Sequence, residues 1–383
     1  MAEYKKPYDR KARLREDYMK HPLMGLTYLG GVGEKIGKWN AKRLAKKKCI
    51  SVNALAAGEE TVQCTFLSHP AEKKSDGFIL KFIGKEGMQV FTIDGGMSVG
   101  DMLRGLTALR ADIMKKAGLE KEIENEQYKL DVNLLISHFH IDHVNELVTN
   151  VIPIRKYFRV LHIYYAADTV MTGDPAFDQM KNGDFTNRPR VMAALKTYHA
   201  ETQYHEIPYG QTLDVKTNVG ALKLFAPSTD WGEKKNAELI VETYYADKPN
   251  PLFDRSPVGI GNNNSTWMRA SFAGKAMLFT GDVMKRKTDR FDEAVDHMIA
   301  YYGAENLRAD IIKHPHHGQA REGCYLPIKE KLLTNDPAAC VVLTGENGCN
   351  EAGPLLDSVN VPWVDLNGGD VTFALTREGS KRL

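Results

Sequence analysis

Ser137-His138-Phe139-His140-Ile141-Asp142-His143 contains three imidazoles and one carboxylate within its last six residues. The apolar run at 132–136, VNLLI, precedes it and is typical of a buried strand. Because side chains alternate along a strand, His138 and His140 face the same side. Asp142 and His143 follow the strand, where the chain turns and can reach a second ion. Imidazole nitrogen and carboxylate oxygen suit zinc, and also manganese or iron, so the stretch predicts a metal site in preference to ordinary surface or core histidines.

From about residue 60 onward, short apolar runs alternate with polar turns. Such runs predict strands, several of them paired as hairpins. Apolar residues at helical spacing predict helices over 98–109 and 144–150 and within 170–200. Loose alternation of strands and helices predicts an α/β sandwich of two mixed sheets flanked by helices. The strand-bearing segments are 61–68, 77–84, 88–96, 132–137, 157–166, 212–215, 221–227, 265–272, 276–283, 309–318, 338–344, 363–369 and 371–375.

Two later segments carry further candidate ligands. LFTGDV at 278–283 places Asp282 directly after an apolar strand. A carboxylate at a strand end is well tolerated where two cations share it, although a Gly-Asp pair is also a common turn. KHPHHGQ at 313–319 adds His314, His316 and His317.

These motifs together resemble those of metallo-β-lactamase-fold hydrolases. HFHIDH at 138–143 matches the family's HxHxDH motif, and IDGG at 93–96, LFTGDV and KHPHHGQ follow the family's order. More narrowly, the chain resembles the hydrolase domain of bacterial DNA-uptake (competence) proteins and their soluble relatives. NNNS at 262–265, LRADIIKHPHHG at 307–318, and VVLTGENG and GGDVTFAL near the end carry that likeness. The resemblance covers roughly residues 60–380 and implies an αββα sandwich.

The resemblance also implies how the candidate residues divide between two divalent metal ions, with zinc expected and manganese or iron possible. His138, His140 and Asp282 would hold the first ion. Asp142, His143, Asp282 and His317 would hold the second. His316 would face the substrate as a hydrogen-bond donor or general acid, although His316 and His317 could exchange roles. Asp94 would orient the histidine loop, and His314 is expected to be structural.

One family feature is missing from this sequence. Many members supply a third histidine to the first metal after the strand that corresponds to ALKLFAP, but here that place reads STDW at 228–231. The remaining candidates are His162, His199 and His205. The first site otherwise keeps His138, His140 and Asp282, with water completing it.

Such a centre predicts an enzyme, a metal-dependent hydrolase in which a metal-bound hydroxide attacks phosphorus or a carbonyl carbon. Phosphodiester hydrolysis, by a phosphodiesterase or nuclease, is the main expectation. Its substrate would be a small phosphodiester or a nucleic acid, with Lys285, Arg286 and Lys287 as candidate phosphate contacts. One alternative is hydrolysis of a carboxylic ester, lactone or thioester. Another is a non-catalytic nucleic-acid-binding protein with a structural metal site.

The N-terminal segment differs from the rest in charge. Residues 1–50 hold fourteen Lys or Arg against five Asp or Glu, a net charge of +9 in a chain of +2. We expect a basic helical extension over 1–58 and the hydrolase domain over 59–383. The extension could attract nucleic acid or an anionic membrane surface, or be a solvated helical face. The five scattered cysteines and the lack of a secretory signal or long apolar run predict a cytoplasmic protein without stable membrane insertion.

Overall fold

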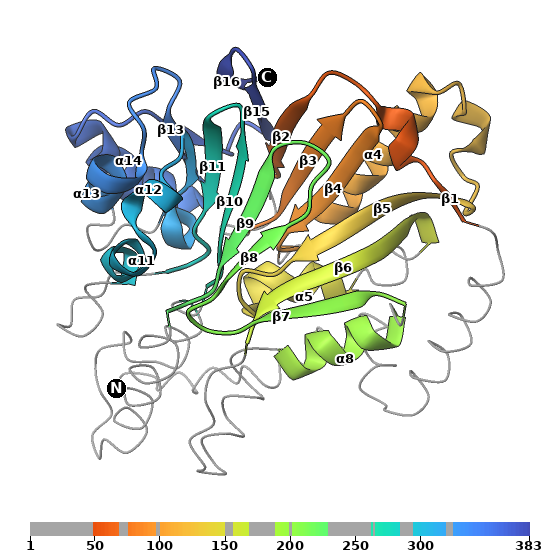
Figure 1. Cartoon of the computed structure of the whole chain (residues 1–383), viewed down its shortest axis with the longest axis horizontal. Coiled ribbons are helices and arrows are strands. Elements are labelled where there is room, and N and C mark those ends of the chain that lie inside the picture. Colours follow the sequence, from red (N-terminus) through yellow and green to blue (C-terminus); the bar gives the residue numbers. More distant parts are fainter. Residues whose placement is uncertain are drawn as a thin grey trace, which may run out of the picture.

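The computed structural model describes most of the chain after residue 48 (Figure 1). The described residues are 49–68, 76–96, 100–149, 156–167, 188–198, 201–228, 262, 265–283, 294–318 and 325–383. Residues 1–48, and with them most of the expected basic extension, lie outside the described part. Lys285, Arg286, Lys287 and His199 also lie outside it. None of the described helices is long and apolar enough to cross a membrane.

The first sheet has nine strands in the order β16-β15-β2-β3-β4-β5-β6-β7, with β1 paired to β5 outside this path. Neighbours from β16 to β4 are antiparallel, whereas β4, β5, β6 and β7 are parallel. Its strands are β1 Ile50–Ser51, β2 Thr61–Phe66, β3 Phe78–Gly84, β4 Gly87–Ile93, β5 Tyr128–Leu135, β6 Phe158–Ala166, β7 Gln203–Ile207, β15 Val371–Thr376 and β16 Gly379–Arg382.

The second sheet has seven strands in the order β14-β13-β12-β11-β10-β9-β8. β8, β9, β10 and β11 are antiparallel neighbours, whereas β11, β12, β13 and β14 are parallel. Its strands are β8 Thr212–Val215, β9 Ala221–Phe225, β10 Trp267–Phe272, β11 Lys275–Phe279, β12 Ile311–Lys313, β13 Cys340–Leu343 and β14 Trp363–Asp365.

A buried apolar layer separates the two sheets and contains the rings of Phe66, Phe78, Phe279 and Phe373. A second apolar layer joins α4, α5 and α8 to the outer face of the first sheet, and a third joins α11, α12 and α14 to the second (Figure 1). The α-helices are α4 Asp101–Lys116, α5 Ile141–Thr149, α8 Arg188–Tyr198, α11 Ala294–Tyr302, α12 Ala304–Leu307, α13 Tyr325–Pro327 and α14 Glu346–Ser358. Shorter turns are η1 Asn53–Ala56, η2 Glu120–Glu122, η6 Pro315–Gly318 and η7 Ile328–Leu332. The predicted architecture, two mixed sheets between layers of helices, is confirmed.

Part of the segment predicted as an extension belongs to the sandwich. Ile50–Ser51 forms a parallel ladder with β5, and Val52 is fully buried. The Asn53 side chain donates to the carbonyl oxygens of Met88 and Asp131, each at 3.0 Å. Residues 50–56 therefore pack against the first sheet.

The parallel strands determine where the candidate site lies. Asp94 follows β4, His138 follows β5, Asp282 follows β11 and His314 follows β12. The backbone N–H of Thr266 donates to the carbonyl of Ser137 at 2.9 Å, so the ends of the two sheets meet at this edge. The carboxyl ends of parallel strands are where open α/β sheets present their ligand-binding residues.

Candidate metal centre

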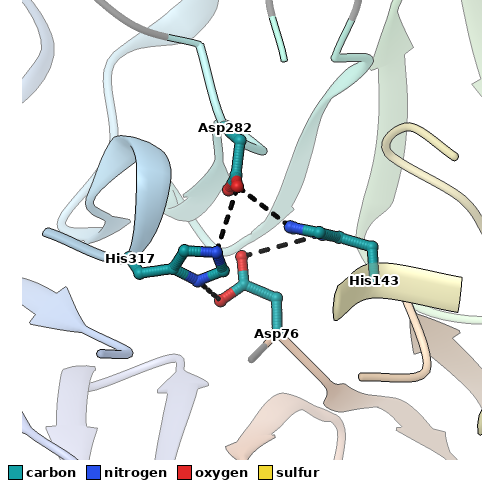
Figure 2. Close-up of side chains that lie close together, drawn as sticks. All are labelled: Asp76, His143, Asp282 and His317. Atoms are coloured by element: carbon teal, nitrogen blue, oxygen red, sulfur yellow. Dashed lines mark hydrogen bonds and ion pairs between the residues drawn. The ribbon is translucent and has the colours of Figure 1, made fainter. Parts of the chain in front are cut away.

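Four buried side chains, Asp76, His143, Asp282 and His317, each offer an atom within 4.8 Å of the others, and together they could hold a metal ion (Figure 2). They come from the segment before β3, from α5, from the end of β11 and from η6. Each is at most 1% exposed. The fold thus collects residues from both sheets into one enclosed group of metal-binding types.

The two imidazole Nε2 atoms converge on one carboxylate oxygen. Oδ2 of Asp282 lies 3.0 Å from Nε2 of His143 and 3.1 Å from Nε2 of His317. Oδ2 of Asp142 lies 3.3 Å from the same Nε2 of His317. Two imidazole nitrogens and two carboxylate oxygens that face one another are a donor set that suits zinc and related cations.

The other imidazole nitrogens point away from Asp282, one toward Asp94 and one toward Asp76. Nδ1 of His143 lies 2.7 Å from Oδ2 of Asp94, and Nδ1 of His317 lies 3.1 Å from Oδ1 of Asp76. A carboxylate on the outer nitrogen fixes the ring and its tautomer and leaves Nε2 for a metal. Asp94 therefore lies where the sequence expected an orienting residue, and Asp76 has the same geometry toward His317.

His138 and His140 lie beside this group. The ring centroid of His138 is 4.6 Å from that of His140 and 4.1 Å from that of His143. Nδ1 of His138 is near the hydroxyl oxygens of Ser137 and Ser265, at 3.1 and 3.3 Å. The Nε2 atoms of His138 and His140 are buried and have no hydrogen-bond partner among the described residues. Since an unpaired buried nitrogen is costly, these two atoms fit a bound metal.

Burial and the neighbouring charges set the protonation of this group. Burial favours the neutral form of Asp282, but His143, His317 and Lys313 outweigh it and hold the pKa of Asp282 well below its usual range. Burial lowers the pKa of His317, but Asp282 and Asp76 outweigh it and raise that pKa to about 10, so a metal bound at Nε2 would replace a proton of this ring. Burial lowers the pKa of His140 to about 4, so His140 is neutral, the form in which imidazole binds a metal.

The three histidines of KHPHHGQ, His314, His316 and His317, differ in burial and in their contacts. His317 is fully buried and contacts Asp142 and Asp282, whereas His316 is half-buried, with its ring centroid 5.6 Å from that of His317. Both have a left-handed backbone, with φ of 47° and 58°, which is uncommon for non-glycine residues and stores strain of the kind that clusters at active sites. His314 is buried, and its Nδ1 lies 2.7 Å from the carbonyl oxygen of Pro315.

Among the candidates for a third histidine at the first metal, His162 and His205 lie elsewhere. Nδ1 of His162 is 3.0 Å from Nε2 of His205 across β6 and β7. His162 is level with Asn133, five residues before His138, and at about 3.3 Å per residue this places it roughly 16 Å back along the sheet. At the expected place, Ser228 is fully buried, and its hydroxyl oxygen lies 2.5 Å from Nε2 of His297.

Sequence reasoning missed Asp76, Thr344 and Lys313 as parts of this centre. Asp76 precedes Gly77 and has the pattern of a turn between two strands. In the structure the Thr344 hydroxyl donates to Oδ1 of Asp76 at 2.6 Å, and the ammonium of Lys313 forms an ion pair with Oδ2. Lys313 is the first residue of the KHPHHGQ motif, but nothing in the neighbouring sequence indicates that its side chain is buried.

Comparisons with known proteins concern the fold. No family model matches the chain, and no curated protein matches it. Among solved structures, it is similar to unliganded yeast PDE1, with 12% identity and a TM-score of 0.43 over 82% of this chain and 99% of that one. It is similar to the metallo-β-lactamase fold protein YhfI from Bacillus subtilis, with 11% identity and a TM-score of 0.36 over 82% and 100%. It is also similar to the short form of human tRNase Z, with 13% identity and a TM-score of 0.32 over 74% of this chain and 92% of that one. At these identities and TM-scores, the likenesses assign neither a substrate nor a mechanism to this chain.

Proposed function

We propose that this chain is a metal-dependent hydrolase that cleaves phosphodiesters. The observation that carries the proposal is the convergence of the Nε2 atoms of His143 and His317 on Oδ2 of Asp282. Each of these imidazoles has a carboxylate on its outer nitrogen. Buried groups of this type, arranged in this way, are typical of a metal centre that is held in place before the substrate arrives.

We assign His138, His140 and Asp282 to a first divalent ion, and Asp142, His143, Asp282 and His317 to a second. Zinc suits both donor sets. When bound, such ions lower the pKa of water to about 7 and neutralise charge on the substrate. Three protein residues at the first site leave a position open, whereas a structural zinc site is usually closed by four protein ligands. This difference favours catalysis over a purely structural site.

The chain's own residues then have distinct tasks. Asp94 and Asp76 hold the outer nitrogens of His143 and His317 and thereby fix the direction of both Nε2 atoms. Asp282 follows β11 of the second sheet and His143 lies on α5, which packs on the first sheet, so their contact also joins the two halves of the sandwich. His316 is half-buried beside His317, and we assign it to hydrogen bonding with the substrate.

The phosphodiester specificity rests on the sequence resemblance to DNA-uptake hydrolases, and one set of assays tests it. Purified protein loaded with zinc or manganese is given bis(4-nitrophenyl) phosphate, a lactone and single-stranded DNA in parallel. We expect hydrolysis of the phosphodiesters that stops with a chelator and returns with metal. Turnover of the lactone alone would show a carboxylic-ester hydrolase instead. DNA binding without turnover of any substrate would show a binding protein.

A further inference from the structure

Lys313 is a fully buried lysine that contacts two residues of the candidate metal centre, Asp76 and Asp282. It ends β12, and it is 1% exposed. Its Nζ lies 2.6 Å from the carbonyl oxygen of Gly281 and 3.0 Å from Oδ1 of Asp282, and it forms an ion pair with Oδ2 of Asp76. An ammonium group has three N–H donors, and these three acceptors match them. Lys313 is therefore placed to hold protein groups and has no donor left for a substrate phosphate.

The contacts of Lys313 close a ring of four buried residues. Lys313 joins Oδ1 of Asp282 to Oδ2 of Asp76, the other oxygen of Asp76 lies 3.1 Å from Nδ1 of His317, and Nε2 of His317 lies 3.1 Å from Oδ2 of Asp282. Each carboxylate in the ring thus has one oxygen beside the ammonium and the other beside His317. Such pairing compensates both buried charges and leaves neither carboxylate free to rotate without breaking a contact.

We infer that Lys313 is a positioning residue that holds Oδ1 of Asp282, so that Asp282 presents only Oδ2 to the metal-binding nitrogens of His143 and His317. The inference rests on the proposed metal-dependent function. It differs from a purely structural role, in which Lys313 would serve only to neutralise Asp76. It also differs from a substrate-binding role, which would require a free N–H group.

The test compares two variants that both lack the charge of Asp76. Lys313→Met alone would leave Asp76 buried without a counter-charge, a change that is strongly destabilising. The double variant Asp76→Asn/Lys313→Met removes both charges, and Asp76→Asn alone is its matched control. In both, the amide oxygen of the new asparagine can still accept from Nδ1 of His317, while its NH2 group replaces Oδ2. In the Asp76→Asn control, Lys313 loses that acceptor but keeps the carbonyl oxygen of Gly281 and Oδ1 of Asp282, the contact under test. Asp76→Asn/Lys313→Gln is a second, more polar form of the double variant in case the first does not fold.

Zinc affinity, measured by competition with a chelator, separates the two roles. Loss of a positive charge beside the site would by itself tighten zinc binding. If Lys313 positions Asp282, the double variant should instead bind zinc about 10- to 100-fold more weakly than Asp76→Asn, as when a partner of a metal ligand is removed. The visible spectrum of the cobalt(II)-loaded protein should change as well, because it reports the ligand geometry. Equal or tighter zinc binding together with an unchanged cobalt spectrum would overturn the inference.

These readouts do not depend on turnover. If the parent protein binds metal but hydrolyses no phosphodiester, the proposed function fails, while affinity and spectrum still decide the role of Lys313. If the double variant matches its control in both readouts, the inference fails and the proposed function stands.

Discussion

His143 and Asp94 form a fully buried pair in which Nδ1 lies 2.7 Å from Oδ2. The same carboxylate accepts from the backbone N–H and the hydroxyl of Ser137, both at 2.7 Å. Asp94 itself has a left-handed backbone, with φ of 55°, as the chain leaves β4. One carboxylate therefore orients His143 and also holds the start of the loop that carries His138.

Replacing Asp94 with asparagine should weaken metal binding about 10- to 100-fold, because Nδ1 of His143 loses its anionic partner. The measurement is zinc affinity by chelator competition. Asp214→Asn, at an exposed position on β8, is the control and should bind as the parent does. An Asp94→Asn protein with the parent's zinc affinity would show that this carboxylate does not orient the ligand.

Asp142→Ala and His140→Ala should each reduce hydrolysis to background while the protein stays folded. Each removes one proposed ligand but leaves the strands of both sheets intact. His205→Ala, which alters a half-buried histidine on β7, should keep the parent's turnover. Turnover and circular dichroism of the three proteins test this. Near-parental turnover with metal bound in either ligand variant would refute the assignment.

Gly281→Ala should damage the site through the backbone. Gly281 has φ of 58°, and a Cβ there would lie 2.5 Å from Oγ of Ser265, which accepts from the backbone N–H of Asp282. Gly274→Ala is the matched control, since its φ is 79° and a Cβ there meets nothing within 4 Å.

The left-handed backbone alone should cost Gly274→Ala about 1–2 kcal/mol of unfolding free energy. Gly281→Ala should cost more and should also lower turnover, because Asp282 has to move. Denaturant unfolding and kinetics measure both. Equal losses of stability with unchanged turnover would mean that this close approach does not position Asp282.

Stability should fall in acid partly through His314. Burial lowers the pKa of this histidine to about 4 from an ordinary 6.5. The folded protein therefore resists protonation while the unfolded chain accepts a proton below pH 6.5. The stability that neutral His314 contributes is full above pH 6.5 and is lost as the pH falls to about 4.

His314→Gln keeps a side-chain N–H donor and removes the titration. Its unfolding free energy should therefore fall less than that of the parent between pH 6.5 and 4. The two proteins, unfolded by denaturant across this range, give the comparison. Parallel pH profiles would show that His314 contributes nothing to acid lability.

Local patterns were sufficient to predict much of this molecule. The apolar run of β5 followed by HFHIDH predicted a strand with ligands at its end, and the structure places His138 and His140 there. The alternation of strands and helices predicted the two mixed sheets. These predictions succeed because a buried strand and the spacing of metal-ligand types can both be recognised within a short window of sequence.

Long-range contacts were not predictable in the same way. Asp76 and His317 are 241 positions apart, and nothing in the sequence near Asp76 distinguishes it from a turn residue. Lysine is a residue type that is usually exposed. Lys313 is buried because it pairs with two carboxylates, Asp76 and Asp282, that are distant in the sequence. The helix predicted over 98–109 is correct in part, because α4 begins at Asp101 and continues to Lys116. The prediction stopped at 109 because polar residues weaken the apolar pattern in the segment that follows.

The most direct test of the central claim is anomalous X-ray scattering at the zinc edge from crystals of the zinc-loaded protein. We predict two peaks, one beside His138, His140 and Asp282 and the other beside Asp142, His143 and His317, with Asp282 contacting both. Zinc bound only at other residues, or no zinc at this cluster in a protein that hydrolyses phosphodiesters, would contradict the account.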